Sequence, residues 1–335
     1  MKKVLTVLVL LLVAGILFAG GGRDQQGAGR PIELIYTTCG VPSDGWAQAM
    51  VKFKEVVERV SNGQIKVLTY DSSTLFKQEQ EVAAVISGQA DLTLTGAQWL
   101  TDGSPWVSMF AAGYMYHSYE HMTKVMNGPI GQEVFERIAK EQGIRPLGAT
   151  YMGTRQINLV EDRPIRTPAD LRGVNLRMPN SEAWIFLGRA LGANPTPISL
   201  SELYMALQTR TVDGTENPLP QNKSGKFYEV TKSVSITNHL VGDIWPSINE
   251  KRWQSMTAQQ KDWIMQGIRA GNQLSDDISL KEEADIINFY KQQGLKVYEA
   301  DIKAFSSYVL DQYLKSDFAK TWDMDVYRKV QAAAN

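Results

Sequence analysis

The order of expected strands and helices is the feature that most constrains the fold of this chain of 335 residues. Residues 32–37 have the alternation of a strand, and Ser43 or Asp44 can cap a helix with apolar side chains three and four residues apart. A second strand at 65–70, a helix at about 77–87 and a third strand at 92–95 follow. Such a β-α-β-α-β order requires parallel pairing and right-handed crossovers.

The same order begins again in the middle of the chain. Thr167-Pro168 predicts a short helix, and a strand at 174–178 leads to a helix at about 181–191. A capping box at 199–202 opens a helix to about 209, and a strand at 212–216 follows. Two such units predict an α/β protein with two lobes and a cleft between them.

A long helix is expected in the last third of the chain. A capping box at 257–260 begins it, and only the isolated Gly267 and Gly271 interrupt the pattern before Gly294. A helix over 258–293 would be ~54 Å long at ~1.5 Å per residue. We therefore expect it to lie across both lobes.

The first 22 residues have the pattern of a secretory signal peptide. Lys2 and Lys3 precede an apolar run that is shorter than the ~20 residues of a membrane span, and small residues follow it. An uncleaved membrane anchor is the alternative. Gly21 stands where a lipobox would need cysteine, so lipid anchoring is unsupported. We expect an exported periplasmic protein.

Composition excludes several functions. The formal net charge of −1 offers no electrostatic surface for nucleic acid. The single cysteine, Cys39, excludes an intramolecular disulfide and fits a small buried residue. Residues 117–121 (HSYEH) resemble a zinc peptidase motif, with His117 and His121 as ligands and Glu120 as base. The alternative is the start of a surface helix.

Two arginines stand in apolar surroundings. Arg155 lies in YMGTRQINLV, and Arg177 lies in the expected strand LRMP. Arginine is seldom buried unless it is paired, and ligands bind at the carboxyl ends of parallel strands. Each arginine therefore either awaits an anion or forms an internal ion pair.

Seven ordered motifs resemble one family. They are GTRQ (153–156), TPADLRG (167–173), LRMPN (176–180), LGANPTP (191–197), ELYMALQT (202–209), VDGTENP (212–218) and KFYEV (226–230). The chain resembles the DctP-type solute-binding proteins of tripartite ATP-independent periplasmic (TRAP) transporters, and its middle section resembles the sialic-acid-binding and sugar-acid-binding branch. The resemblance implies a two-lobed, type II-like binding protein with mixed sheets flanked by helices, whose long C-terminal helix spans both lobes.

The resemblance also implies site residues. Arg177 matches the arginine that holds the substrate carboxylate by two hydrogen bonds, and Arg155 matches a second, supporting arginine. Asn180 and Asn217 match amides near that carboxylate. A planar guanidinium fits a carboxylate in a way that lysine cannot copy.

The first lobe departs from the sialic-acid branch. Lys77, Gln78, Gly96 and Trp99 lie near the positions of its charged sugar-binding groups, and Thr38 and Cys39 replace a polar amide. Sialic acid itself is therefore not expected. Further candidates for the lining are Gln98, Trp184 and Trp245, and for each tryptophan the alternative is core packing.

These observations predict a receptor rather than an enzyme, with no cofactor and no metal. We expect residues 31–152 plus about 243–283 in lobe I, and 153–242 plus about 284–335 in lobe II. The expected partners of this monomer are a small organic acid, with a hexuronate or aldonate favoured, and the TRAP membrane permease subunits. The alternatives are another acid (a keto acid, a dicarboxylate, or an aromatic or amino-acid-like acid), a sensory role, and an exported zinc hydrolase using HSYEH.

Overall fold

The computed structural model describes residues 30–334 of the chain, and the predicted signal peptide lies outside them. The strands and helices of the first half of the chain, in order, are β1 (Ile32–Thr37), α1 (Gly45–Val60), β2 (Ile65–Tyr70), α2 (Gln78–Ser87), β3 (Leu92–Thr95), α3 (Tyr119–Met126), α4 (Pro129–Gln142) and β4 (Ile144–Pro146). Strands β1, β2 and β3 are parallel, as predicted, and the bounds of all three agree with the prediction.

The second half of the chain crosses between the lobes. Its elements are β5 (Thr150–Leu159), β6 (Asn175–Met178), α5 (Glu182–Ala190), β7 (Asn194–Pro197), α6 (Leu203–Gln208), β8 (Gly214–Pro218), α7 (Leu219–Ser224), β9 (Ser233–Asn249), α8 (Glu250–Ser255), α9 (Ala258–Gln292), β10 (Lys296–Glu299), α10 (Ile302–Leu314) and α11 (Met324–Ala332). Strand β8 begins two residues later than predicted.

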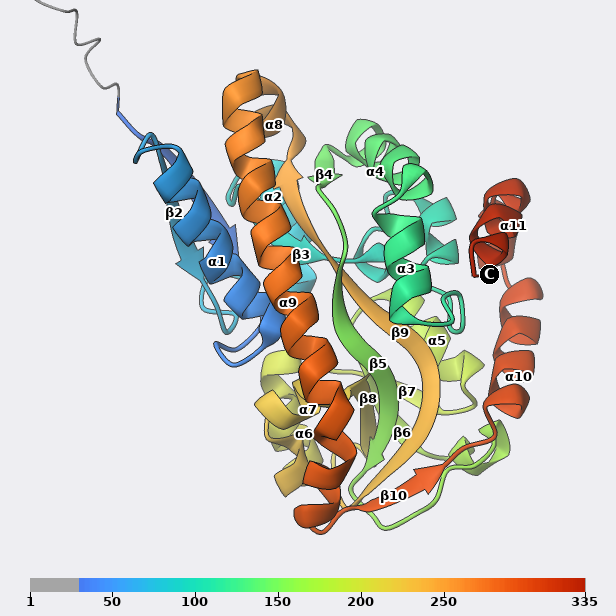
Figure 1. Cartoon of the computed structure of the whole chain (residues 1–335). Helices are drawn as coiled ribbons and strands as arrows, with labels where there is room; N and C mark the ends of the chain where they lie inside the picture. Colours follow the sequence, from blue (N-terminus) through green and yellow to red (C-terminus); the bar gives the residue numbers. More distant parts are fainter. Residues whose placement is uncertain (1–29, 335) are drawn as a thin grey trace, which may run out of the picture.

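Strand β9 connects the two lobes (Figure 1). The sheet order is β2-β1-β3-β9-β5-β8-β6-β7, with β4 and β10 paired to opposite ends of β9. The end of β9 is antiparallel to β3 in the first lobe, while its earlier part pairs with β5 and β10 in the second. The two lobes thus share one sheet of parallel and antiparallel strands flanked by helices. This arrangement confirms the expected α/β fold class.

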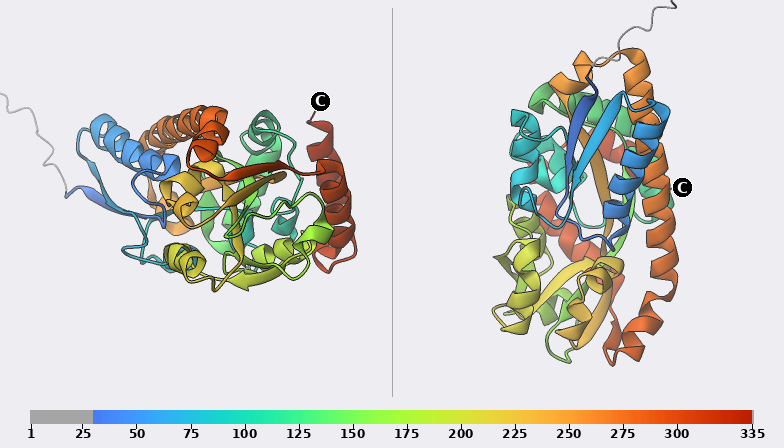
Figure 2. Two further views of the ribbon diagram at one scale, coloured as in Figure 1. Left: turned by 90° about the horizontal axis from the view of Figure 1, so that it is seen from below. Right: turned by 90° about the vertical axis from the view of Figure 1, so that its left-hand side faces the viewer.

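Helix α9 braces both lobes, as Figures 1 and 2 show. Thr257 Oγ1 accepts a hydrogen bond from the Gln260 amide, which is the predicted capping box, and the helix then runs for 35 residues. Its first half packs on α1 in a core that contains Phe53, Val57 and Ile264. Near its other end, Tyr290 donates to the carbonyl of Leu219 in the second lobe.

The division of the chain between the lobes stays a prediction. The end of the chain contacts residues expected in lobe I: Trp322 Nε1 donates to Ser108 Oγ at 3.0 Å, and the carbonyl of Val330 lies 2.8 Å from His121 Nε2. The prediction that all of 284–335 belongs to lobe II does not account for these contacts. Within residues 30–334, the structure has no helix long and apolar enough to cross a membrane.

Candidate functional site

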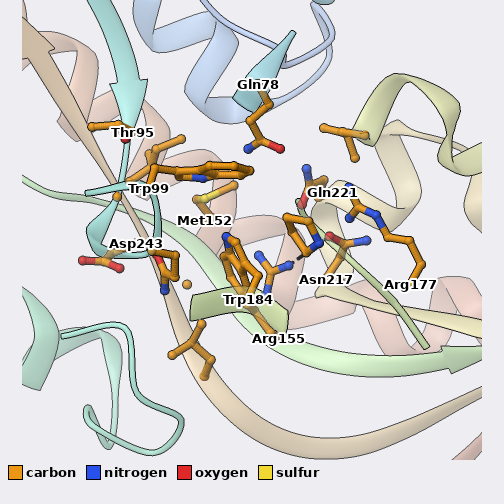
Figure 3. A pocket seen from close by; sticks show the side chains of 17 residues that line it. Gln78, Thr95, Trp99, Met152, Arg155, Arg177, Trp184, Asn217, Gln221 and Asp243 are labelled. Atoms are coloured by element: carbon orange, nitrogen blue, oxygen red, sulfur yellow. Dashed lines mark hydrogen bonds between the residues drawn. The ribbon is translucent and has the colours of Figure 1, made fainter. Parts of the chain in front are cut away.

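A cavity of about 490 Å³ lies where the two lobes meet. Residues of both lobes line it (Figure 3): Gln78, Thr95, Gly96, Gln98, Trp99, Met152, Arg155, Arg177, Pro179, Trp184, Leu200, Asn217, Gln221, Leu240, Gly242, Asp243 and Ile244. Seven of the nine site residues predicted from the sequence line this cavity, and they include the two tryptophans Trp99 and Trp184.

Arg177 projects from β6 into this cavity and has no acidic partner. Its Nε donates to the carbonyl of Ile198 at 2.8 Å, and its Nη2 is buried without a hydrogen-bond partner. Among residues 30–334, no carboxylate forms an ion pair with it. Burial lowers the pKa of Arg177 to about 10, although Glu216 opposes this shift, so the guanidinium stays charged at neutral pH. A buried cation of this kind needs an anion.

Arg155 differs, because the structure pairs it internally. Its Nε lies 2.6 Å from Glu216 Oε2, and its Nη2 lies 2.7 Å from Glu216 Oε1 and 3.0 Å from Asn217 Oδ1. His239 Nε2 lies 3.0 Å from the same carboxylate. Burial alone would raise the pKa of Glu216, but Arg155 and His239 outweigh it and hold the pKa at about 2. The alternative of an internal ion pair thus holds for Arg155 and not for Arg177.

The backbones of β5 and β9 approach each other closely just before Arg155. Gly153 and Gly242 face each other across β5 and β9, and a Cβ on Gly242 would lie 2.6 Å from the Gly153 carbonyl oxygen. Gly153 has φ of +109° at an irregularity in the pairing, a conformation that favours glycine. The glycine of the GTRQ motif therefore lets two strands cross closely beside the cavity.

The first lobe contributes amide and aromatic groups. Gln78 is the first residue of α2, and Gln98 and Trp99 lie in a 3₁₀ turn after β3. Trp184, on α5 of the second lobe, stacks under the Arg155 guanidinium at 4.5 Å from the ring centroid. Ser181 donates to the Gln98 carbonyl at 2.9 Å and so joins the lobes beside the cavity.

Three expected residues are not in the lining. Asn180 is exposed, and Thr38 is buried beside β2, where its amide donates to the Tyr70 carbonyl. Trp245 is fully buried against Phe135, and its Nε1 donates to Asp243 Oδ2 at 2.6 Å. The core-packing alternative is therefore correct for Trp245. Trp245 pairs with Thr95 across β3 and β9, and packing against Phe135 takes its ring out of the lining.

Sequence reasoning missed Gln221, Met152 and Asp243. Gln221 lies on α7, four residues after Asn217, and its buried Oε1 has no hydrogen-bond partner. Because α7 follows β8 without a loop, proximity to Asn217 was the available signal. Asp243 is buried, and burial raises its pKa to about 7. No pattern marked Met152 or Asp243, because both depend on the pairing of β5 with β9.

The HSYEH segment forms the start of α3. Ser118 caps the helix by accepting a hydrogen bond from the His121 amide. His121 Nδ1 accepts from the His117 amide at 3.1 Å, so its Nε2 donates to the Val330 carbonyl. Both ring nitrogens of His121 are engaged, which agrees with the alternative of a capped surface helix. Among residues 30–334, no group of three His, Cys, Asp or Glu side chains could hold a metal.

The fold and this cavity together define a two-lobed solute receptor. The family model of the bacterial extracellular solute-binding proteins, family 7 (DctP), matches residues 38–320, so the chain belongs to this family. The resemblance stated from the motifs is confirmed, and the family consists of receptors rather than enzymes. The zinc hydrolase alternative is therefore wrong.

Three relatives show the range of similarity. A TRAP periplasmic solute-binding protein from Roseobacter denitrificans, with bound 3-deoxy-D-manno-oct-2-ulosonic acid, is 36% identical, with a TM-score of 0.86 over 90% of this chain and 99% of that one. A second from the same organism, with bound L-galactonate, is 28% identical, with a TM-score of 0.82 over 91% and 99%. The sialic acid-binding periplasmic protein of Vibrio cholerae is 30% identical over 78% of this chain and 81% of its own.

Proposed function

We propose that this protein is the extracytoplasmic receptor of a TRAP transporter, and that it binds a monocarboxylate sugar acid such as a hexuronate or aldonate. It then delivers this acid to the membrane permease. The observation that carries the proposal is the buried guanidinium of Arg177, which lies in the interlobe cavity without an acidic partner in residues 30–334.

The charges of the cavity favour one carboxylate rather than two. Glu216 already neutralises Arg155, so the described lining offers Arg177 as its unpaired cation. A second carboxylate on the ligand would be buried near Asp243 without a cation, which is costly. Dicarboxylates and other organic acids remain the alternative ligands.

The remaining lining suits a chain of hydroxyl groups. Gln78, Gln98, Asn217 and Gln221 supply amides that can donate to or accept from hydroxyls. Trp99 and Trp184 supply apolar planes for the carbon skeleton (Figure 3). The sugar acids bound by the two Roseobacter relatives, an ulosonate and an aldonate, have the same combination of one carboxylate and several hydroxyls.

The expected mechanism is closure around the acid. The carboxylate first meets Arg177 in the second lobe, and Gln78, Gln98 and Trp99 complete the site when the first lobe closes. The closed form gains population only by as much as the ligand binds it better. The assignment of residues 31–152 plus about 243–283 to one lobe and the remainder to the other is part of this proposal.

A thermal-shift screen identifies the ligand class. It compares hexuronates and aldonates with keto acids, dicarboxylates and aromatic acids. A ligand at 100 times its dissociation constant adds ~2.7 kcal/mol of stability. We expect the largest shift with a sugar acid. A larger shift with a dicarboxylate would contradict the preference for one carboxylate.

Substitution of Arg177 tests the site. Arg177→Ala should weaken binding of the identified acid by at least ~30-fold, because it removes one side of a buried charged pair. Arg177→Lys should give an intermediate affinity, since it keeps the charge and loses the planar pair of donors. Titration calorimetry measures both, and the exposed Arg172→Ala is the matched control. An unchanged affinity in Arg177→Ala would exclude this residue from binding.

A further inference from the structure

A second and larger cavity, with a volume of about 1590 Å³, lies on the opposite face of β5 and β9 from the candidate site. Consecutive residues of these strands separate the two: Met152 and Leu240 line the first cavity, whereas Tyr151 and Val241 line the second. Side chains alternate between the faces of a strand, so the sheet divides the cavities. The residues that line the second cavity come from β5, β9, α9, α10 and the start of α3, which are labelled in Figure 1.

The second cavity differs from the first in the charge of its lining. Its lining is rich in aromatic rings: Tyr114, Tyr116, Tyr119, Tyr151, Tyr313, Tyr327 and Trp322. Glu283 contributes a carboxylate, and the exposed His117 lies in the lining as well. Within the described part of the chain, no lysine or arginine is among the lining residues. An anionic ligand would therefore find no countercharge here.

Helix α9 arranges two carboxylates along this side. Asp276 and Glu283 are seven residues apart, two helical turns, and so lie on one face. Tyr119 donates to Asp276 Oδ2 at 3.1 Å, and Tyr151 donates to Glu283 Oε2 at 2.5 Å. These two tyrosine rings are tilted toward each other, with their centroids 5.3 Å apart.

The two carboxylates have no countercharge. Among residues 30–334, neither Asp276 nor Glu283 forms an ion pair with a basic side chain, although hydrogen bonds hold both in place. Burial raises the pKa of Glu283, a shift that a neighbouring cation would oppose. The Tyr116 side chain also lines the cavity, and its buried hydroxyl has no hydrogen-bond partner.

We propose that this cavity is a second ligand site, separate from the acid-binding cleft, and that it binds an organic ammonium cation. Aromatic faces attract ammonium groups, most strongly when water is excluded, and Glu283 provides the countercharge.

Two pairs of probes test whether the positive charge is recognised. Choline is compared with its uncharged carbon analogue 3,3-dimethylbutan-1-ol, and phenethylamine with 2-phenylethanol, by titration calorimetry of the full chain without any acid. We expect saturable binding of at least one cation, and binding of its neutral analogue that is about tenfold weaker or undetectable. Failure of both cations to bind, or equal binding of cation and neutral analogue, would overturn the proposal.

Variants locate the site. Glu283→Gln keeps the size of the side chain and should weaken cation binding about tenfold, while Tyr119→Leu removes one ring and should weaken it severalfold. Glu282→Gln is the matched control on the neighbouring position of α9, where the carboxylate instead lies 3.4 Å from Lys223. Equal affinity in Glu283→Gln and Glu282→Gln would place the cation elsewhere. A sugar-acid titration of each variant checks that the lobes are intact.

Discussion

At the scale of single residues, two buried arginines with different partners define the candidate site. Arg155 on β5 and Arg177 on β6 flank β8, whose Glu216 and Asn217 both turn toward Arg155. Arg155 is thereby neutralised and stacked on Trp184, whereas Arg177 has no acidic partner among residues 30–334. The same residue type thus serves the fold at one position and, we propose, the ligand at the other.

The buried ion pair predicts a pronounced effect of Glu216→Gln. Removing one partner leaves Arg155 as an uncompensated buried charge, which typically costs ~3–5 kcal/mol. The folded pKa of Glu216 is about 2, below its ordinary value of 4.5, so its stabilisation is present above pH 4.5 and is lost as the pH falls toward 2. Chemical denaturation at neutral pH measures the free energy of unfolding. The control is the exposed Glu202→Gln, and equal stabilities would contradict the prediction.

At the scale of elements, the packing of α9 on α1 depends on glycine. A Cβ on Gly271 would lie 2.8 Å from the Ala49 carbonyl oxygen, and one on Gly267 would lie 2.5 Å from Val57 Cγ2. Glycine inside a helix costs about 1 kcal/mol relative to alanine. These two residues, which weakened the helix prediction from the sequence, therefore permit close approach of the two helices.

Gly271→Ala should destabilise the protein, although alanine is the better helix former. The backbone of α1 must move to accept the methyl group, and overpacking of this kind costs ~1–3 kcal/mol. Thermal and chemical denaturation measure the change, with Gln273→Ala on the exposed side of the same helix as the control. A stabilised Gly271→Ala protein would show that the helices can separate at no cost.

At the scale of the whole molecule, polar contacts join the lobes around the cleft. Asp44, which precedes α1, accepts a hydrogen bond from Ser224 at the end of α7, and Glu79 accepts one from Ser199. Lys77 and Glu202 form an ion pair at 2.7 Å, but both side chains are about half exposed, so its contribution is small. The structure therefore has the lobes in contact, and Asp44 is the most buried of these charged groups.

Burial of Asp44 predicts a pH-dependent closure. It raises the pKa of Asp44 to about 7 from 3.8, so the closed form binds a proton more tightly than a form with Asp44 in water. Closure is thus favoured at low pH and loses free energy as the pH rises from 3.8 to 7. Affinity for the acid should fall about tenfold or more across this interval.

Asp44→Asn isolates this contribution. The variant should lose that part of the pH dependence, because asparagine does not titrate and can still accept from Ser224. Calorimetric titrations of the wild type and the variant at several pH values measure the difference. The exposed Asp102→Asn is the control, and identical pH profiles for the wild type and Asp44→Asn would refute the role of Asp44.

The sequence by itself determined the elements whose signals are local. Apolar periodicity and capping residues located β1, β3 and both ends of α9 to within one residue, because these signals lie within a few residues of the element they define. Motif resemblance determined the family. The resemblance and the neighbouring sequence together predicted seven residues that line the cavity: Arg155, Arg177, Asn217, Gln78, Gln98, Trp99 and Trp184.

Only the tertiary structure decided what depends on long-range pairing. The 17-residue strand β9 joins both lobes, because it pairs with β3 and β4 at one end and with β5 and β10 along the rest. The pairing of β5 with β8 brings Arg155 beside Glu216, whereas Arg177 on β6 has no acidic partner among residues 30–334. The physical reason is that a buried charge is defined by its neighbours in space, and these come from strands that are distant in the sequence.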